Sequence, residues 1–175
     1  MNVILHNILE NKVFTREKIV ELDLSYRGLK CLPDLSMYPY LKILNISYNQ
    51  LTSLDGLPDT IEELNCSSNY ITTLPFIPKI RKLDCFLNSI QFLPNEFPET
   101  LEWFNGMNNF LEILPINMPL NLRYFNCGNN LITFLPTFKE GLEYIDYSYN
   151  FLEKEPVLPL SVKTIYSKNA MQLKK

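Results

Sequence analysis

One pattern of residues, Leu-x-x-Leu-x-Leu-x-x-Asn-x-Leu-x-x-Leu-Pro, recurs along this chain at intervals of about twenty residues. A period of this length is typical of a solenoid, in which each repeat buries its apolar side chains against those of its neighbours. The repeats begin at Ile19, Leu41, Ile61, Ile80, Leu101, Leu122, Leu142 and Val162. The spacing therefore predicts a repeat solenoid that occupies nearly the whole chain.

The ninth position of the pattern is Asn in every interior repeat, at Asn49, Asn69, Asn88, Asn109, Asn130 and Asn150. Arg27 and Ala170 replace it in the two terminal repeats, as is normal at the ends of arrays. We expect these amides to turn inward and to hydrogen-bond backbone groups of their own and the adjacent repeat. Their predicted role is structural rather than catalytic.

Proline follows leucine near the end of five repeats, at Leu32-Pro33, Leu74-Pro75, Leu93-Pro94, Leu114-Pro115 and Leu135-Pro136. With this signature the chain resembles the leucine-rich repeats, and in particular the short-repeat bacterial subclass found in secreted effectors of pathogens. The resemblance implies a right-handed curved array, of the α/β class by family but mostly β here. It also implies a parallel concave sheet and polyproline II-like convex segments. The ligases of that family use a separate domain with a nucleophilic cysteine, so we expect this chain to resemble the non-enzymatic scaffolds.

Positions three to five of each repeat are predicted to form short parallel strands about 4.8 Å apart. All twelve prolines fall between these strands, where proline favours an extended return segment over a helix. Residues 19–169 would then form eight repeats. Residues 1–18 would form an N-terminal cap with a short amphipathic helix, and residues 170–175 a C-terminal tail.

The inward-facing sixth position is small in the middle of the array, with Cys66, Cys85, Gly106 and Cys127. Where it is smallest, the fourth position is large, because Phe104 accompanies Gly106. Such compensation keeps a core filled, so we interpret the three cysteines as small core residues. Buried cysteines without evident mates favour a reducing compartment.

Composition and motifs exclude several kinds of site. The formal charge of −3 with interspersed signs argues against nucleic acid, and no stretch is long and apolar enough for a membrane span. We find no catalytic constellation, no metal site and no cofactor motif. Position five reads Asx in seven successive repeats, but its three carboxylates would lie about 14 Å apart, too far to share an ion. We expect these side chains to bond to one another and to water.

Position two alternates in sign between neighbouring repeats, in the order Lys42, Glu62, Arg81, Glu102, Arg123, Glu143 and Lys163. Such residues predict a ladder of ion pairs across the strands. Because each exposed pair contributes at most about 1 kcal/mol, this ladder serves register and solubility more than affinity.

Aromatic residues gather at the outward positions of the later repeats. From repeat four onward, one face of the sheet should carry Phe86, Trp103, Met107, Tyr124, Tyr144 and Tyr166. The first three repeats carry mainly Glu and Ser at the same positions. Aromatics also suit strands for their own sake, yet a large exposed aromatic patch marks an interaction site. We therefore predict that these six residues contact a partner.

The leading hypothesis is a cytoplasmic protein-interaction scaffold that binds a protein on its concave face, acting in the host cytosol if it comes from a pathogen. One alternative is an inhibitor or regulator of a host enzyme. Another is a receptor for carbohydrates or small ligands that stack on the aromatic patch. Self-association through the concave face or the terminal edges is a further option.

Overall fold

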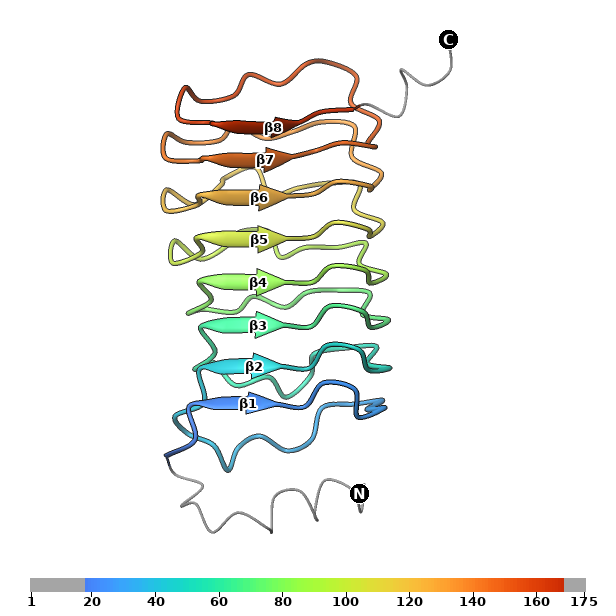
Figure 1. Cartoon of the computed structure of the whole chain (residues 1–175), viewed down its shortest axis with the longest axis vertical. Coiled ribbons are helices and arrows are strands. Elements are labelled where there is room, and N and C mark those ends of the chain that lie inside the picture. The colour runs from blue at the N-terminus through green and yellow to red at the C-terminus, as the bar shows by residue number, and fades with distance from the viewer. Residues whose placement is uncertain (1–17, 169–175) are drawn as a thin grey trace.

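A computed structural model of the chain describes residues 18–168 as one ladder of short parallel strands (Figure 1). The strands are β1 (Glu21–Asp23), β2 (Ile43–Asn45), β3 (Glu63–Asn65), β4 (Lys82–Asp84), β5 (Trp103–Asn105), β6 (Tyr124–Asn126), β7 (Tyr144–Asp146) and β8 (Thr164–Tyr166). They form one eight-stranded sheet in chain order. The predicted N-terminal helix and C-terminal tail lie outside the described residues.

Every strand occupies positions three to five of its repeat, as the pattern predicts, and equivalent positions are paired in register throughout the sheet. Between the strands, residues 24–163 contain no helix. The proline-rich return segments are consistent with this, because proline supplies no backbone donor to a helix. The chain is therefore a leucine-rich-repeat type of solenoid with a parallel sheet along one side.

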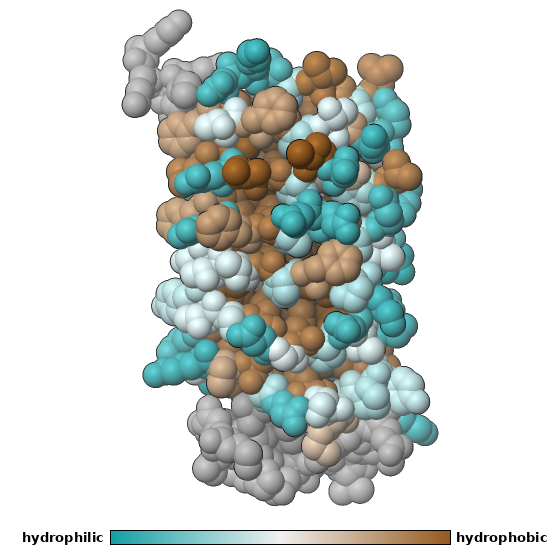
Figure 2. Space-filling view, turned by 180° about the vertical axis from the view of Figure 1, so that it is seen from behind, coloured by the Kyte–Doolittle hydropathy of each residue, from teal (hydrophilic) through white to brown (hydrophobic). Residues whose placement is uncertain are grey.

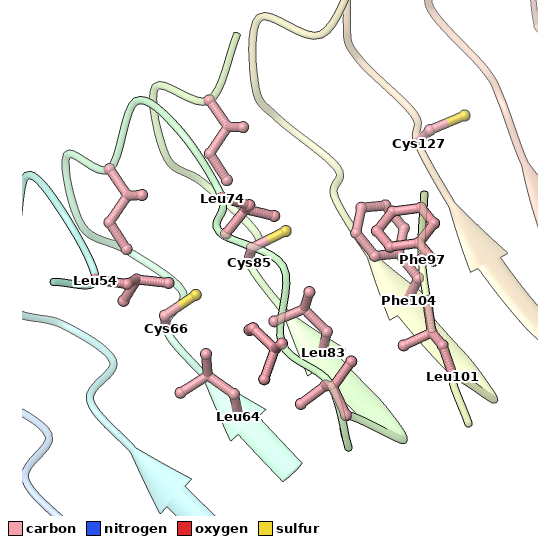
Figure 3. Close-up of a cluster of buried hydrophobic side chains, with 14 of the residues drawn as sticks. Leu54, Leu64, Cys66, Leu74, Leu83, Cys85, Phe97, Leu101, Phe104 and Cys127 are labelled. Atoms are coloured by element: carbon pink, nitrogen blue, oxygen red, sulfur yellow. The ribbon is translucent and has the colours of Figure 1, made fainter. Parts of the chain in front are cut away.

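The core is a single continuous cluster that runs from Leu24 to Leu152, whereas the last strand, β8, is exposed. Positions four and six point into it, which places Cys66, Cys85 and Cys127 among leucines and phenylalanines, fully buried (Figure 3). The Phe104 ring fills the space beside Gly106, since a Cβ built on Gly106 would lie 2.7 Å from two atoms of that ring. Phe104 also packs against Phe97 and Phe125, with ring centroids 5.1 and 5.2 Å away. The predicted compensation of volume is confirmed.

The interior asparagines form a buried hydrogen-bond ladder, as predicted. Asn88 is representative: its Oδ1 accepts from the amide of Ile71 at 3.0 Å. Its Nδ2 donates to the carbonyl of Cys66 in the preceding repeat at 3.0 Å and to that of Cys85 in its own repeat at 3.2 Å. Each asparagine thus satisfies buried backbone groups of two successive turns and joins the repeats to one another.

The eighth position of seven successive repeats adopts a left-handed backbone, which the repeat pattern did not reveal. The φ angles lie between 52° and 58° at Tyr26, Tyr48, Ser68, Leu87, Asn108, Asn129 and Tyr149. Only two of the seven are asparagines, the residue type that tolerates this region best among those present. The turn before the asparagine ladder therefore holds this conformation even where a tyrosine or leucine disfavours it.

The cysteines provide a test of the core assignment. Burial raises the pKa of the Cys66, Cys85 and Cys127 thiols, whereas Cys31 is exposed. Because the thiolate is the reactive form, we expect iodoacetamide to alkylate Cys31 rapidly in the native protein and the other three only on unfolding. Mass spectrometry of peptides from a labelling time course measures this order. Equal native rates at all four sites would contradict the buried placement.

Candidate functional site

The solvent-facing side of the sheet, here called the sheet face, is formed by positions three, five and seven of the repeats. Position three contributes a column of stacked side chains along β4 to β7. The rings of Trp103 and Tyr124 are stacked with centroids 4.7 Å apart, and those of Tyr124 and Tyr144 with centroids 4.2 Å apart. Tyr166 extends the column at a tilt of 46°, with its centroid 5.8 Å from Tyr144.

A lysine lies at the β4 end of this column, opposite Tyr166. The Nζ of Lys82 lies 5.4 Å from the centroid of Trp103, within the range of a cation–π interaction. Lys82, Trp103, Tyr124, Tyr144 and Tyr166 together are called the aromatic column below. It spans five successive strands, β4 to β8, and each contact joins neighbouring repeats.

Phe86 and Met107, the other two predicted site residues, lie on the same face at position seven of repeats four and five. Both are half-buried, as are Trp103, Tyr124 and Tyr144, and only Tyr166 is exposed, at 54%. The six residues therefore share one face, but the patch is less open than the sequence suggested. Stacking explains the difference, because each ring covers a face of its neighbour.

The hydroxyl groups of the column are also close together. The pKa of Tyr144 is raised, first by burial and then by its hydrogen bond with Tyr124. The Tyr144 hydroxyl is therefore protonated at neutral pH. The column presents ring edges and hydroxyl groups to solvent, which suits a partner that offers both apolar and hydrogen-bonding groups.

The Asx residues at position five bond mainly within their own repeat, which corrects the expected ladder between strands. Asn45 Oδ1 accepts from the Ser47 amide at 3.1 Å and from the Ser47 hydroxyl at 2.7 Å. Bonds between neighbouring members of this column also occur, from Asn105 Nδ2 to Asp84 Oδ1 at 3.1 Å and between the side chains of Asn45 and Asp23. The reason is local geometry, because an Asx oxygen readily reaches the amide two residues further on.

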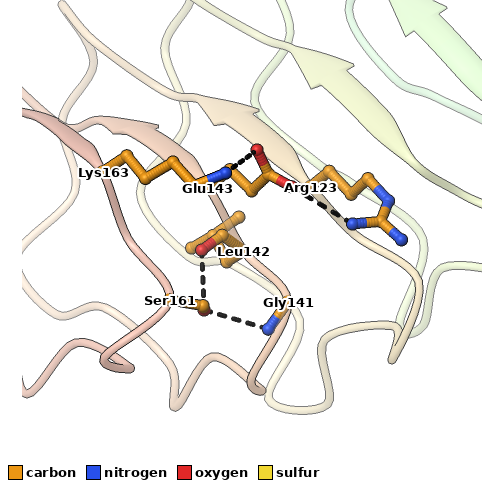
Figure 4. A network of polar contacts seen from close by, with 6 residues as sticks. All are labelled: Arg123, Gly141, Leu142, Glu143, Ser161 and Lys163. Carbon is orange, nitrogen blue, oxygen red and sulfur yellow. Dashed lines mark hydrogen bonds and ion pairs between the residues drawn. The ribbon is translucent and has the colours of Figure 1, made fainter.

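The charged residues at position two form ion pairs between neighbouring repeats, as predicted. Lys42 pairs with Glu62 at 2.7 Å, and Arg81 with Glu102 at 2.7 Å. Glu143 is bonded on both sides, to Arg123 at 3.2 Å and to Lys163 at 2.8 Å (Figure 4). These side chains are largely exposed and neutralise one another, which leaves no single-sign stripe for recognition.

Two surfaces escaped the sequence analysis. The first is a pair of rings, Tyr26 and Tyr48, which stack at position eight with centroids 4.3 Å apart.

The second surface is a groove of about 480 Å³ between the return segments of repeats four and five. It lies beside Phe92, Ile113 and Ile116, all of them exposed. Brown apolar atoms are accordingly visible among polar ones on the side opposite the sheet face (Figure 2). The residues that line this groove follow position seven of their repeats, so the outward positions three, five and seven did not reveal it.

The described residues offer no group of three or more acidic, His or Cys side chains that could hold a metal ion. Nor does any helix within residues 18–168 have the length and apolar character needed to cross a membrane. The chemistry available on the sheet face is that of aromatic edges, hydroxyls, amides and a few carboxylates.

Comparison with known proteins agrees with this geometry. The family described as Leucine Rich Repeat matches residues 40–62. The solved leucine-rich repeat domain of a Shigella effector is 28% identical, with a TM-score of 0.77 over 97% of this chain and 76% of that chain. YopM from Yersinia enterocolitica WA-314 is 27% identical, with a TM-score of 0.68 over 87% of this chain and 38% of YopM. The chain thus has a leucine-rich repeat fold similar to that of bacterial effectors.

A similarity to a curated protein is more local. Protein NUD1 of Saccharomyces cerevisiae is 38% identical over 58 residues, which is 33% of this chain and 7% of NUD1. The chain spans only a small part of NUD1 and well under half of YopM. What is shared is a repeat scaffold of the kind that generally presents an extended surface for binding.

Proposed function

We propose that this protein is a non-catalytic interaction scaffold that binds a protein partner on its sheet face, with the aromatic column and the adjoining Phe86 and Met107 at the centre of the contact. The observation that carries the proposal is the unbroken column over β4 to β8. Its tryptophan and tyrosines are residue types enriched in the centres of protein interfaces.

The column is also preorganised for binding. Each aromatic side chain of β5 to β7 is held by a neighbour on at least one face, so little rotamer freedom remains to be lost on association. Rigid aromatic side chains are efficient anchors for the same reason.

Stacking weighs against the carbohydrate receptor. Sugar rings bind against open aromatic faces, whereas neighbours cover both faces of the Tyr124 ring and the Lys82 side of Trp103. The rings instead present their edges and hydroxyls, which favours a protein surface or segment. An inhibitor of a host enzyme would use the same contact, and loss of the captured enzyme's activity would distinguish it from an adaptor.

We also propose a reducing compartment such as the cytosol, with the host cytosol as the site of action if the source is a pathogen. The four cysteines support this, because all are free.

Affinity capture from a eukaryotic cytosolic extract tests the binding face. We compare the wild-type protein with a Trp103→Ala/Tyr124→Ala variant by quantitative mass spectrometry. The variant is expected to weaken binding of the specific partner by about 2 kcal/mol or more, roughly thirtyfold in Kd, because central aromatic anchors dominate interfaces. Its melting temperature should stay close to that of wild type, since neither ring belongs to the core.

A Phe92→Ala/Phe134→Ala variant is the matched control, because it removes two exposed rings from the return segments instead. It should retain the partner, and so should a Glu21→Lys/Glu63→Lys variant at the polar end of the sheet face. If the return-segment variant loses the partner while the column variant keeps it, the partner binds the return segments and the proposed binding face is wrong.

A further inference from the structure

The last strand of the sheet, β8, has one side that no strand within residues 18–168 covers (Figure 1). All three residues of β8 are exposed. Ile165 occupies position four, which points into the core in the interior repeats. It is nevertheless 50% exposed, whereas Ile145, its register partner on β7, is fully buried. A core position is therefore open to solvent at this end of the solenoid, and this side of β8 is called the open edge below.

The backbone along the open edge has the same donors and acceptors as the interior strands. In repeats one to seven the position-two carbonyl accepts from the next repeat, as Glu143 accepts from the Lys163 amide at 2.8 Å. The position-six amide donates to the next repeat, as Tyr147 donates to the Tyr166 carbonyl at 2.9 Å. The equivalent groups at the open edge are the Lys163 carbonyl and the Ser167 amide. No residue in the described part of the chain bonds to either of them.

These two groups define the direction and register of any strand that would bind there. A parallel strand aligned like β7 and β8 would donate its amides to the Lys163 carbonyl and accept from the Ser167 amide. An antiparallel strand presents its donors and acceptors at different spacings. The open edge therefore selects a parallel segment, and the fourth position of that segment would cover Ile165.

The charge at position two specifies a residue type for such a strand. Interior cations of this position lie between two acids, as Arg123 lies between Glu102 and Glu143. Lys163 has Glu143 on one side, at 2.8 Å, and its side chain is 72% exposed. On its other side no acid within residues 18–168 pairs with it. An acidic residue at position two of an added strand would complete the alternation of charge.

A second copy of this chain does not match the open edge. Its first strand, β1, would bring Val20 to position two beside Lys163, where the edge calls for an acid. Two open edges related by a two-fold axis would run antiparallel and would set Lys163 and Lys168 of one copy against those of the other. Lysines on an edge strand oppose pairing of this kind.

We propose that the open edge binds a strand of the protein partner, parallel to β8. The strand carries Asp or Glu at position two beside Lys163 and an apolar residue at position four over Ile165. This inference rests on the proposed function, because it assigns the strand to the partner that covers the aromatic column. Tyr166 joins the two surfaces, since it is the last ring of the column and lies on β8. In strand addition, main-chain bonds supply affinity and side chains supply specificity.

Three variants separate the open edge from the fold. Ser167→Pro removes the edge amide but keeps the Tyr166 carbonyl that accepts from Tyr147. Ser167→Ala is its control, because it removes only the hydroxyl. Lys163→Glu reverses the charge at position two, on an exposed side chain. Circular dichroism checks that each variant folds. Should the proline disturb β8, the charge reversal still tests the proposal.

The probe is an acetylated, amidated peptide with the sequence of residues 142–150, which has Glu at position two and Ile at position four. In the protein this segment already lies beside a cation at position two, Arg123. We titrate the peptide into isotope-labelled protein while recording amide NMR signals, and expect those of Ile165 and Ser167 to shift. Kd should rise by about tenfold or more in Ser167→Pro and Lys163→Glu, and not in Ser167→Ala. A peptide with the Glu143→Lys change should prefer Lys163→Glu to wild type.

Several outcomes would overturn the proposal. They are equal binding of a peptide with the reversed sequence, no shift at millimolar peptide, and an unchanged Kd in both Ser167→Pro and Lys163→Glu. A Ser167 amide that is protected from hydrogen exchange in the free protein and loses protection when residues 169–175 are deleted would assign the edge to the chain's own tail. A dimer that Ser167→Pro dissociates in sedimentation would assign it to a second copy.

A captured partner provides the second arm. If Trp103→Ala/Tyr124→Ala releases the partner while Ser167→Pro and Lys163→Glu both keep it at wild-type affinity, the edge assignment is wrong and the proposed function stands. If the two edge variants release the partner and the column variant keeps it, the open edge is a binding site and the proposed binding face is wrong.

Discussion

The Phe104→Ala variant is expected to lose about 3–5 kcal/mol of unfolding free energy, the largest effect of any single change considered for this protein. Phe104 is fully buried and fills the space that Gly106 leaves open. Truncation to alanine would create a cavity between two turns of the solenoid, beside the rings of Phe97 and Phe125. Neither neighbour can close it without moving its own repeat. Urea denaturation followed by circular dichroism measures the loss.

The reverse substitution tests the same contact. Gly106→Ala should also destabilise, because its Cβ would meet the Phe104 ring at 2.7 Å. Combining Gly106→Cys with Phe104→Leu recreates the Leu and Cys pair that repeats three and four already use at positions four and six. This double variant should recover most of the stability lost by Phe104→Ala. Additive losses in the double variant would show that the two positions do not compensate each other.

The Asn88→Ala variant is expected to cost about 3 kcal/mol, because it leaves several buried backbone groups without partners at once. The amide of Ile71 loses its acceptor, and the carbonyls of Cys66 and Cys85 lose a donor. Since these groups belong to two successive repeats, the damage falls on the interface between them. Solenoid stability depends on such interfaces, so hydrogen exchange should accelerate first in repeats three and four.

Asn105→Ala is the matched control for the ladder. Asn105 lies on the sheet face, half-buried, where its bonds run to Asp84 and to the amide of Met107. Water can replace these bonds, so the expected cost is below about 1 kcal/mol. Similar denaturation midpoints for Asn88→Ala and Asn105→Ala would contradict the assignment of inner and outer positions.

Much of the architecture follows from repeat spacing. The strand bounds, the parallel register, the inward asparagines and the buried cysteines were all predictable, because a period of about twenty residues places equivalent positions side by side. The grouping of Phe86, Trp103, Met107, Tyr124, Tyr144 and Tyr166 on one face follows for the same reason, since side chains alternate across a strand. Their role in binding stays a prediction.

Other features depend on side-chain rotamers, hydrogen-bond partners and backbone angles, which the repeat spacing does not specify. The rings of the aromatic column stack and so become half-buried, the Asx oxygens turn to their own repeat, and position eight adopts a positive φ even at Leu87. Each outcome depends on rotamers, on donors two residues away or on the shape of a turn.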